Sequence, residues 1–209
     1  MKNIIKKPFT YSYGNYALFI IAINFLFFLL TSFNHKYMYY FSMRPINIIR
    51  VHAYWQFLTY MFTHAGFSHI LFNMLGLFFF GFALERRLGS KEFLLFYFFC
   101  GIGAGVFSFF YYVTTGNLGV FLLGASGAVY AVLLGYAVFF PNSIIYIMGI
   151  IPLRATWVVI IYTIIEIFSQ FGSRGQVAHF THLAGFAFAY FYIWVRMGIN
   201  PADIFFRRR

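Results

Sequence analysis

The chain has 209 residues, of which 62% are hydrophobic and only 9% are charged, and its formal net charge is +11. Roughly a quarter of the residues in a soluble domain are charged, so this composition excludes an ordinary soluble protein and indicates a membrane protein. The positive charge does not indicate nucleic-acid binding, because the basic residues lie at the edges of apolar runs rather than in one patch.

Six long apolar runs, separated by short polar breaks, begin at Asn15. A membrane-spanning helix needs about 20 apolar residues, each with a rise of about 1.5 Å. The runs predict an all-α membrane protein with a bundle of six transmembrane helices, at residues 15–33, 68–84, 93–114, 124–140, 155–171 and 179–196. The first run lacks the small residues of a signal-peptide cleavage site, so we expect it to be retained as a span.

Basic residues are distributed unevenly around these runs. If the N-terminus is cytoplasmic, eleven of the fifteen lysines and arginines lie in inner segments and four in outer segments, as the positive-inside rule requires. The outer four are Lys36, Arg44, Arg50 and Arg174, and the inner eleven are Lys2, Lys6, Lys7, Arg86, Arg87, Lys91, Arg154, Arg196, Arg207, Arg208 and Arg209. We therefore expect a cytoplasmic segment (1–14), one membrane domain (15–196) and a basic cytoplasmic tail (197–209).

The segment between the first two runs, residues 34–67, is too long for a hairpin loop. Its apolar residues follow helical spacing and are interrupted by polar residues, so we predict an amphipathic helical piece that lies at the outer interface. The apolar positions are Ile48, Val51, Tyr54, Trp55, Leu58, Met61 and Phe62.

Four polar residues stand out inside the predicted spans: His69 and Asn73 early in the second, Ser126 early in the fourth and His182 early in the sixth. A polar side chain in hydrocarbon is costly unless it has a partner or lines a cavity. With the N-terminus inside, every even-numbered span runs from outside to inside, so all four residues lie at one depth in the outer leaflet. This coincidence predicts a single polar site that opens outward.

Ser126 and His182 are a candidate nucleophile and base. Small residues repeat beside both, a pattern that lets helix backbones approach closely in lipid: Gly127, Ala131 and Gly135 in the fourth span, Gly185 and Ala189 in the sixth. Close approach would bring serine and histidine within hydrogen-bond reach, about 2.6–3.2 Å. No acid is near His182 in sequence, so we predict a dyad rather than a triad, with Tyr130 as a support on the helical face of Ser126.

Acyl transfer also needs donors aimed at the developing oxyanion, each worth about 3–4 kcal/mol. His69 and Asn73 are four residues apart and so present donors on one helical face. The backbone amide of Ser126, near a predicted helix N-terminus, would be a third donor. Each residue alone also has a structural interpretation, as a serine bonded to its own backbone or as an interhelical hydrogen bond. Their shared depth favours one functional site.

These motifs share one family resemblance, which extends from about Trp55 to Tyr190. The serine motif reads Gly124-Ala125-Ser126-Gly127 with Tyr130 following, the second-span motif reads His64 and then His69 to Asn73, and the base motif reads His182-Leu183-Ala184-Gly185. They resemble the motifs of the rhomboid family of intramembrane serine proteases, in its bacterial six-span form.

Further positions resemble structural features of the same family. Glu85 and Arg87 look like its acidic-x-Arg turn, which implies a structural role at the cytoplasmic end of the second helix. Trp55 matches the tryptophan of a Trp-Arg pair in the first outer loop, but Gln56 replaces the arginine. This departure concerns only the anchoring of that loop.

The resemblance implies a water-filled cavity open to the outside and hydrolysis of peptide bonds in or near the spans of single-span membrane proteins, through an acyl-enzyme. Substrates would enter laterally past the fifth helix. The expected partners are these substrates and membrane lipid, with no nucleic acid, no metal and no organic cofactor. The expected location is a bacterial inner membrane, with several spans and a cytoplasmic N-terminus.

Two other classes of protein remain open. A rhomboid-like pseudoenzyme that binds membrane clients without cutting them would typically lack Ser126 or His182, and both are present. A small transporter or channel would place ionisable groups at several depths, whereas only Glu166 stands apart from the outer cluster.

Glu166 is the acid deep in a predicted span, and we expect it to be protonated or turned toward the bundle. One interpretation is a neutral acid that bonds to a neighbouring helix. The other is that it holds the fifth helix, the expected substrate gate, against the core. In the second case Glu166→Leu would raise cleavage of membrane-embedded substrates but not of a short soluble peptide.

Overall fold

The computed structural model describes residues 9–147, 149–169 and 176–206 of the chain, with the backbone alone for 176–178. The predicted end segments, 1–14 and 197–209, are therefore described in part. Several basic residues used for the predicted topology lie outside the described residues: Lys2, Lys6, Lys7, Arg174, Arg207, Arg208 and Arg209.

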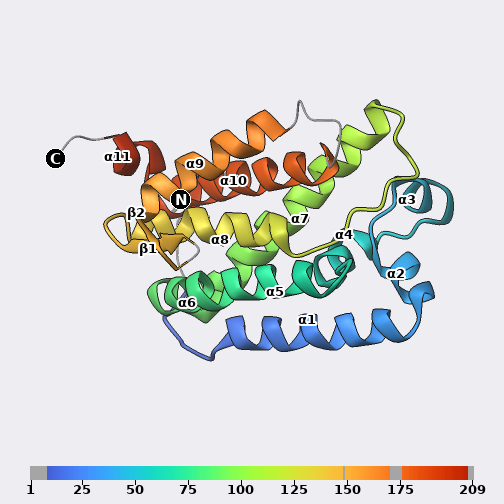
Figure 1. Cartoon of the computed structure of the whole chain (residues 1–209), viewed down its shortest axis with the longest axis horizontal. Coiled ribbons are helices and arrows are strands. Elements are labelled where there is room, and N and C mark those ends of the chain that lie inside the picture. Colours follow the sequence, from blue (N-terminus) through green and yellow to red (C-terminus); the bar gives the residue numbers. More distant parts are fainter. Residues whose placement is uncertain (1–8, 148, 170–175, 207–209) are drawn as a thin grey trace, which may run out of the picture.

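Each of the six predicted apolar runs forms a helix over most of its described residues, and the helices pack into one bundle (Figure 1). They are α1 (Tyr16–Phe33), a continuous rod made of α5 (Phe67–Gly76), the π-helical segment η3 (Leu77–Gly81) and α6 (Phe82–Leu88), then α7 (Ser90–Thr114), α8 (Ser126–Phe139), α9 (Ala155–Ser169) and α10 (Gln176–Met197). Among the described residues, α1, the α5–α6 rod and α7 are long and apolar enough to cross a membrane, and α8 and α9 are shorter apolar helices.

Helix α8 occupies the centre of the bundle, where it packs against α7, α9, α10 and the α5–α6 rod. Its small and aliphatic residues are buried on almost every side, as expected for a helix that is apolar all round. The surrounding helices expose large apolar side chains instead, including Phe19, Phe72, Phe79, Phe110 and Phe168. Such a surface is stable only where it contacts lipid, which fits an integral membrane protein.

The two ends of the bundle carry different connections (Figure 1). At one end, here called the hairpin end, lie a two-stranded antiparallel sheet of β1 (Ile144–Ile147) and β2 (Ile151–Arg154), with Ile144 opposite Arg154, and the short helix α11 (Pro201–Phe206). At the other, here called the loop end, lie α2 (His35–Phe41) and α3 (Pro45–Val51). The structure is mostly helical, as predicted, but the hairpin was not predicted, because each strand has only four residues and gives no apolar period long enough to read.

The single amphipathic piece predicted within residues 34–67 is also wrong. The chain there forms α2, α3, α4 (Gln56–Thr59) and the 3₁₀ turn η2 (Tyr60–Phe62). His52 has a φ of 54°, in the left-handed region, and it ends α3. The helical spacing of apolar residues therefore does not continue through His52 as one helix.

Trp55 and Gln56 anchor this segment at the loop end. The Trp55 Nε1–H donates to the Tyr40 carbonyl at 3.0 Å, and its ring stacks on Tyr40 with centroids 5.0 Å apart. The buried Gln56 amide donates to the same carbonyl at 3.1 Å and accepts the Arg44 N–H at 3.0 Å. Gln56 thus fixes the loop through hydrogen bonds to the backbone.

Glu85 and Arg87 lie in α6, close to the turn into α7. The fully buried Glu85 carboxylate accepts the backbone N–H groups of Tyr16 at 2.8 Å and Ala17 at 2.9 Å. These amides belong to the first turn of α1, where no intrahelical acceptor exists. The Arg87 guanidinium lies over the Phe139 ring, 5.4 Å from its centroid. Both side chains therefore join helices at the hairpin end.

Candidate active site

Ser126 is the first residue of α8, and backbone hydrogen bonds fix the loop that leads into it. Leu122 and Met43 exchange two N–H···O bonds of 2.9 Å, and the Gly124 N–H donates to the Tyr60 carbonyl at 2.9 Å. Gly124 has a φ of +114°, which a residue with a side chain rarely adopts. The position of the serine is thus set by the loop end of the bundle.

His64, in the loop before α5, supports the residue that precedes Ser126. Its buried Nε2 accepts the Ala125 N–H at 3.5 Å, and its ring meets that of His69 edge to face. Burial, followed by the nearby His69, lowers the pKa of His64 to about 3. The imidazole is therefore neutral near pH 7, and Nε2 keeps the lone pair that this hydrogen bond needs.

The structure brings Ser126 and His182 into direct contact across α8 and α10. The Ser126 Oγ lies 2.8 Å from the His182 Nε2. The helices approach closely because Gly185 sits against the Gly127 carbonyl, where any Cβ would collide. Gly135, which was predicted to belong to the same small-residue surface, faces Leu84 and Phe96 instead. The glycine-to-backbone contact between α8 and α10 therefore lies at the end of α8 that carries the serine.

Tyr130 supports His182 rather than Ser126. Its ring stacks on the imidazole with an interplanar angle of 9° and centroids 4.2 Å apart. Its hydroxyl donates to the Glu166 carboxylate at 2.5 Å. Tyr130 therefore limits rotation of the His182 ring while it holds a second residue beside that ring.

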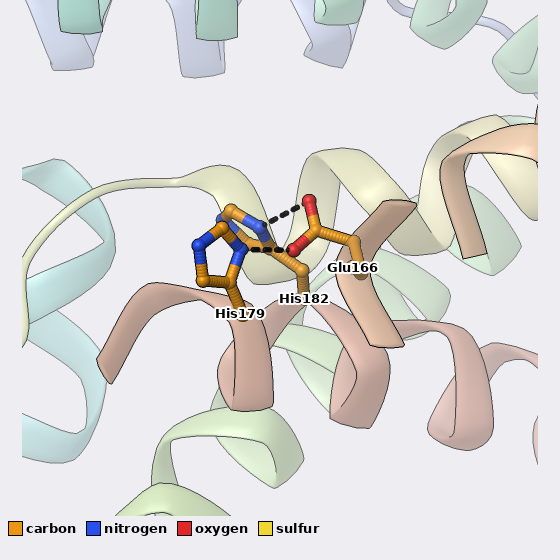
Figure 2. A group of neighbouring side chains, drawn as sticks. All are labelled: Glu166, His179 and His182. Atoms are coloured by element: carbon orange, nitrogen blue, oxygen red, sulfur yellow. Dashed lines mark hydrogen bonds and ion pairs between the residues drawn. The ribbon is translucent and has the colours of Figure 1, made fainter. Parts of the chain in front are cut away.

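The sequence predicted no acid beside His182, and this prediction is wrong. Glu166 in α9 places its Oε1 3.0 Å from the His182 Nδ1, as Figure 2 shows. The acid is 16 residues away in sequence and on another helix, so sequence proximity could not reveal it. The signal that could have found it is its position as a deep acid in a span, because such a group must turn toward a polar partner.

His179 completes this cluster, and sequence reasoning missed it altogether. Its Nδ1 lies 2.5 Å from the Glu166 Oε2, so the carboxylate is held between two imidazoles of α10 (Figure 2). His179 precedes His182 by three residues and therefore lies on the same helical face. That spacing was available in the sequence as a possible signal.

His69 and Asn73 lie in α5 beside the serine, as their spacing predicts. The His69 Nδ1 accepts the Ala65 N–H at 3.4 Å, which leaves the proton of a neutral ring on Nε2. A Cβ at Gly124 would lie 2.7 Å from that Nε2 and 3.8 Å from the Ser126 Oγ. The His69 imidazole therefore lies close to the serine, and the missing side chain of Gly124 leaves room for it. The Asn73 amide donates one hydrogen to the His69 carbonyl at 2.8 Å, and its second N–H remains for another acceptor.

These residues line a cavity of about 720 Å³ that extends along α8. Ser126, His182, His69 and Asn73 form its polar end. Most of the remaining wall is apolar and comes from the α5–α6 rod, α8, α9 and the β1 strand, with residues such as Phe72, Phe79, Val129, Leu133, Ile145 and Val158. The cavity can therefore take an apolar chain along its length and present one part of it to the serine.

The polar atoms of Glu166, His179 and His182 lie within 4.8 Å of one another and so make a candidate metal site. A metal ion would need the lone pair of the His182 Nδ1, and the proton of the neutral ring would then reside on Nε2. An Nε2–H group facing Ser126 cannot accept the hydroxyl proton. The hydrogen-bonded arrangement, with the proton on Nδ1, is the one that leaves His182 able to act as a base.

Comparison with known proteins gives a consistent result. A family model described as the Rhomboid domain matches residues 51–199. The chain is 36% identical to the putative rhomboid protease YdcA of Bacillus subtilis, over 44% of this chain and 45% of that protein. It is 34% identical to the rhomboid protease GluP of B. subtilis, over 66% of this chain and 27% of that protein.

A third relative is the rhomboid protease GlpG of Salmonella paratyphi A, which is 32% identical over 68% of this chain and 48% of that protein. The chain thus spans about half or less of the length of these curated relatives. The matched residues include Ser126, His182, His69, Asn73 and Tyr130, together with the helices that carry them. On the match over residues 51–199, the chain belongs to the rhomboid family.

Proposed function

We propose that this protein is an intramembrane serine endopeptidase, which cleaves peptide bonds in or near the transmembrane segments of single-span membrane proteins. The observation that carries the proposal is the 2.8 Å contact between the Ser126 Oγ and the His182 Nε2, at the polar end of an otherwise apolar cavity. Membership of a family whose curated relatives are named rhomboid proteases supports the same reaction.

In the first half of the reaction, the His182 Nε2 accepts the hydroxyl proton while the Ser126 Oγ attacks the scissile carbonyl carbon. The carbonyl π electrons move to its oxygen and form a tetrahedral oxyanion. When this intermediate collapses, the C–N bond breaks and His182 gives its proton to the leaving amine. The product is an ester between the substrate acyl group and Ser126.

In the second half, water attacks the ester carbon and His182 accepts a proton from it. The tetrahedral intermediate then expels the Ser126 Oγ, which takes the proton back from His182. The acid product leaves, and the serine and histidine regain their starting protonation states. We propose that water reaches the ester through the cavity from the outer side of the membrane.

The oxyanion would be stabilised by three donors beside Ser126. The backbone N–H of Ser126 belongs to the first turn of α8 and lies outside the intrahelical hydrogen-bond ladder. The His69 Nε2–H and the second Asn73 N–H add side-chain donors from α5. One donor of this kind is worth about 3–4 kcal/mol to the transition state.

We further propose that all six helices span a bacterial inner membrane, with the N-terminus in the cytoplasm and the loop end outside. A substrate span would reach the cavity laterally, past α9, and an extended or weakened helical segment would meet Ser126. The apolar wall supplied by α8 and α9 suits such a segment. Lipid would contact the exposed apolar faces of the outer helices.

The proposal is tested by reconstituting the full chain in liposomes together with a generic single-span membrane protein. We expect the parent protein to cleave this substrate and Ser126→Ala to leave it intact, because the variant has no nucleophile. Cleavage by Ser126→Ala at the parent rate would remove the serine from the reaction. No cleavage by either protein in several substrates would favour a client-binding role.

A further inference from the structure

The Glu166 carboxylate is the point at which three helices meet. It accepts hydrogen bonds from Tyr130 of α8 and from His179 and His182 of α10, at distances of 2.5–3.0 Å. Glu166 itself belongs to α9 and is buried, with only 4% of its surface exposed. Figure 2 shows the two histidine contacts; Tyr130 in turn stacks on His182, whose Nε2 lies 2.8 Å from the Ser126 Oγ.

The chemistry of the contact to His182 is specific. An ionised carboxylate accepts hydrogen bonds and donates none, so it selects the His182 tautomer with its proton on Nδ1. That tautomer directs the Nε2 lone pair toward the Ser126 Oγ. When Nε2 takes the serine proton, the imidazolium that forms lies 3.0 Å from an anionic oxygen, which stabilises it. The dyad predicted from the sequence is thereby extended to three residues.

The pattern of burial along α9 shows that Glu166 also helps to hold this helix against the bundle. The buried residues of this helix at its β2-proximal end are Ala155, Val158 and Val159, whereas Glu166 is the buried residue of the described stretch 160–169. Large side chains beside it, Ile164, Ile165 and Phe168, are exposed. The loop-end half of α9 is therefore held to the bundle by the Glu166 carboxylate together with the half-buried Tyr162, whose ring meets that of Tyr130 with centroids 6.1 Å apart.

From these two properties we infer that Glu166 is a positioning residue that couples the packing of α9 to the basicity and orientation of His182. This inference rests on the proposed protease function. When α9 packs against α10, the carboxylate holds the His182 Nδ1–H and the base is ready. When the loop-end half of α9 moves outward to admit a substrate span, the same carboxylate leaves the imidazole, and the reaction waits for the helix to return.

Under the gate interpretation, the sequence alone led us to expect that Glu166→Leu would raise cleavage of membrane-embedded substrates, and this inference reverses that expectation. Loss of the carboxylate would still loosen α9, as proposed for a gate residue, but it would also deprive His182 of its partner. Glu166→Leu should therefore lower cleavage of every substrate. A membrane-embedded substrate should lose less than a soluble peptide, because loosening of α9 helps only a substrate that must pass it.

The experiment measures kcat and KM for the parent, Glu166→Leu and Glu166→Gln, with a short soluble peptide and with a single-span substrate in liposomes. For the peptide, we expect Glu166→Leu to lower kcat on the order of 100-fold with little change in KM. Glu166→Gln keeps an oxygen that can accept the Nδ1–H, so it should recover part of this loss. The rate of labelling of Ser126 by a fluorophosphonate should fall in the same order.

Thr163→Val is the matched control, because the Thr163 hydroxyl donates only to the Val159 carbonyl of its own helix, at 2.8 Å. We expect it to keep the parent kcat on both substrates. Thermal unfolding in detergent checks that each variant is folded, and the near-isosteric Glu166→Gln keeps the test decisive if Glu166→Leu does not fold.

Two results would overturn the inference. A parent-like kcat for the peptide in both folded Glu166 variants would show that the carboxylate does not position the base. Equal losses for peptide and membrane substrate would show that it positions the base without holding α9. The proposed function itself fails in a different way, through activity that survives in Ser126→Ala.

Discussion

The two ends of the bundle each bury carboxylates, but they surround them with different partners. At the hairpin end, Glu85 accepts backbone N–H groups of α1, and Glu92 accepts the Arg196 guanidinium at 2.5 and 2.9 Å and the Tyr192 hydroxyl at 2.5 Å. Toward the loop end, Glu166 meets two histidines and a tyrosine.

The partners explain what each carboxylate can do. A backbone amide and a guanidinium keep their protons throughout the physiological pH range, so Glu85 and Glu92 can only tie helices together. An imidazole can gain and lose a proton in that range. Glu166 contacts the His182 imidazole, and that imidazole in turn contacts Ser126, which lines the cavity. We therefore propose that Glu166 takes part in chemistry because its partner can exchange a proton, whereas Glu85 and Glu92 contribute to stability.

The largest expected difference between the two ends comes from removing the serine and its base at the loop end. Ser126→Ala and His182→Ala should each abolish detectable cleavage, a loss of about 10⁴-fold or more, because nucleophile and base act as a unit. The double variant should be no worse than either single variant. Cleavage rates in liposomes, with unfolding temperatures as the folding control, test this, and losses that multiply in the double variant would contradict a joint role.

A smaller loss is expected at the neighbouring donors of α5. Asn73→Ala and His69→Ala each remove one of three proposed oxyanion donors and should lower kcat by about 100-fold, less than the loss of Ser126. The measurement is kcat on a soluble peptide, so that substrate access past α9 does not enter. Unchanged kcat in both single variants and in their combination would leave these residues as contacts between helices.

Two substitutions at Tyr130 distinguish the effect of its ring packing on His182 from that of its hydrogen bond to Glu166. Tyr130→Phe keeps the stack on His182 and removes the hydroxyl that donates to Glu166. We expect kcat to fall by about 5-fold, in line with loss of one hydrogen bond of about 1 kcal/mol. Tyr130→Ala, which removes both contacts, should lose more. An equal loss in the two variants would mean that the stack contributes nothing.

A substitution at the hairpin end should lower the free energy of unfolding and leave the cleavage rate unchanged. Glu85→Ala leaves two amides of α1 without their acceptor and should lower the free energy of unfolding by about 1–3 kcal/mol. The cleavage rate per folded molecule should stay at the parent value. Thermal unfolding in detergent and cleavage normalised to Ser126 labelling measure the two quantities separately. A loss of rate without a loss of stability would break the distinction between the two ends.

Much of this arrangement follows from the sequence, because the apolar runs fix the helices and the polar residues within them are few. The shared depth of Ser126, His182, His69 and Asn73 was enough to predict their gathering at one end of the cavity. An orientation of Glu166 toward the bundle was one of the two expected states, but its partner was not predictable in the same way, since His182 is 16 residues away and on another helix.

The loop end shows a second limit. Between residues 48 and 62, His52, with a positive φ, divides what the apolar spacing presents as a single helix. The hairpin was missed for the opposite reason, because four-residue strands carry too little periodicity. At the loop end the backbone is set by contacts with distant parts of the chain, such as the pairing of Met43 with Leu122.

The central claim, that Ser126 is a nucleophile activated by His182, is tested most directly by covalent labelling. The protein in liposomes would be treated with a fluorophosphonate, and the modified residue would be located by mass spectrometry of its peptides. The account predicts one phosphonylated residue, Ser126, in the parent, no label in Ser126→Ala and greatly slowed labelling in His182→Ala. Modification of another serine, or labelling of His182→Ala at the parent rate, would contradict it.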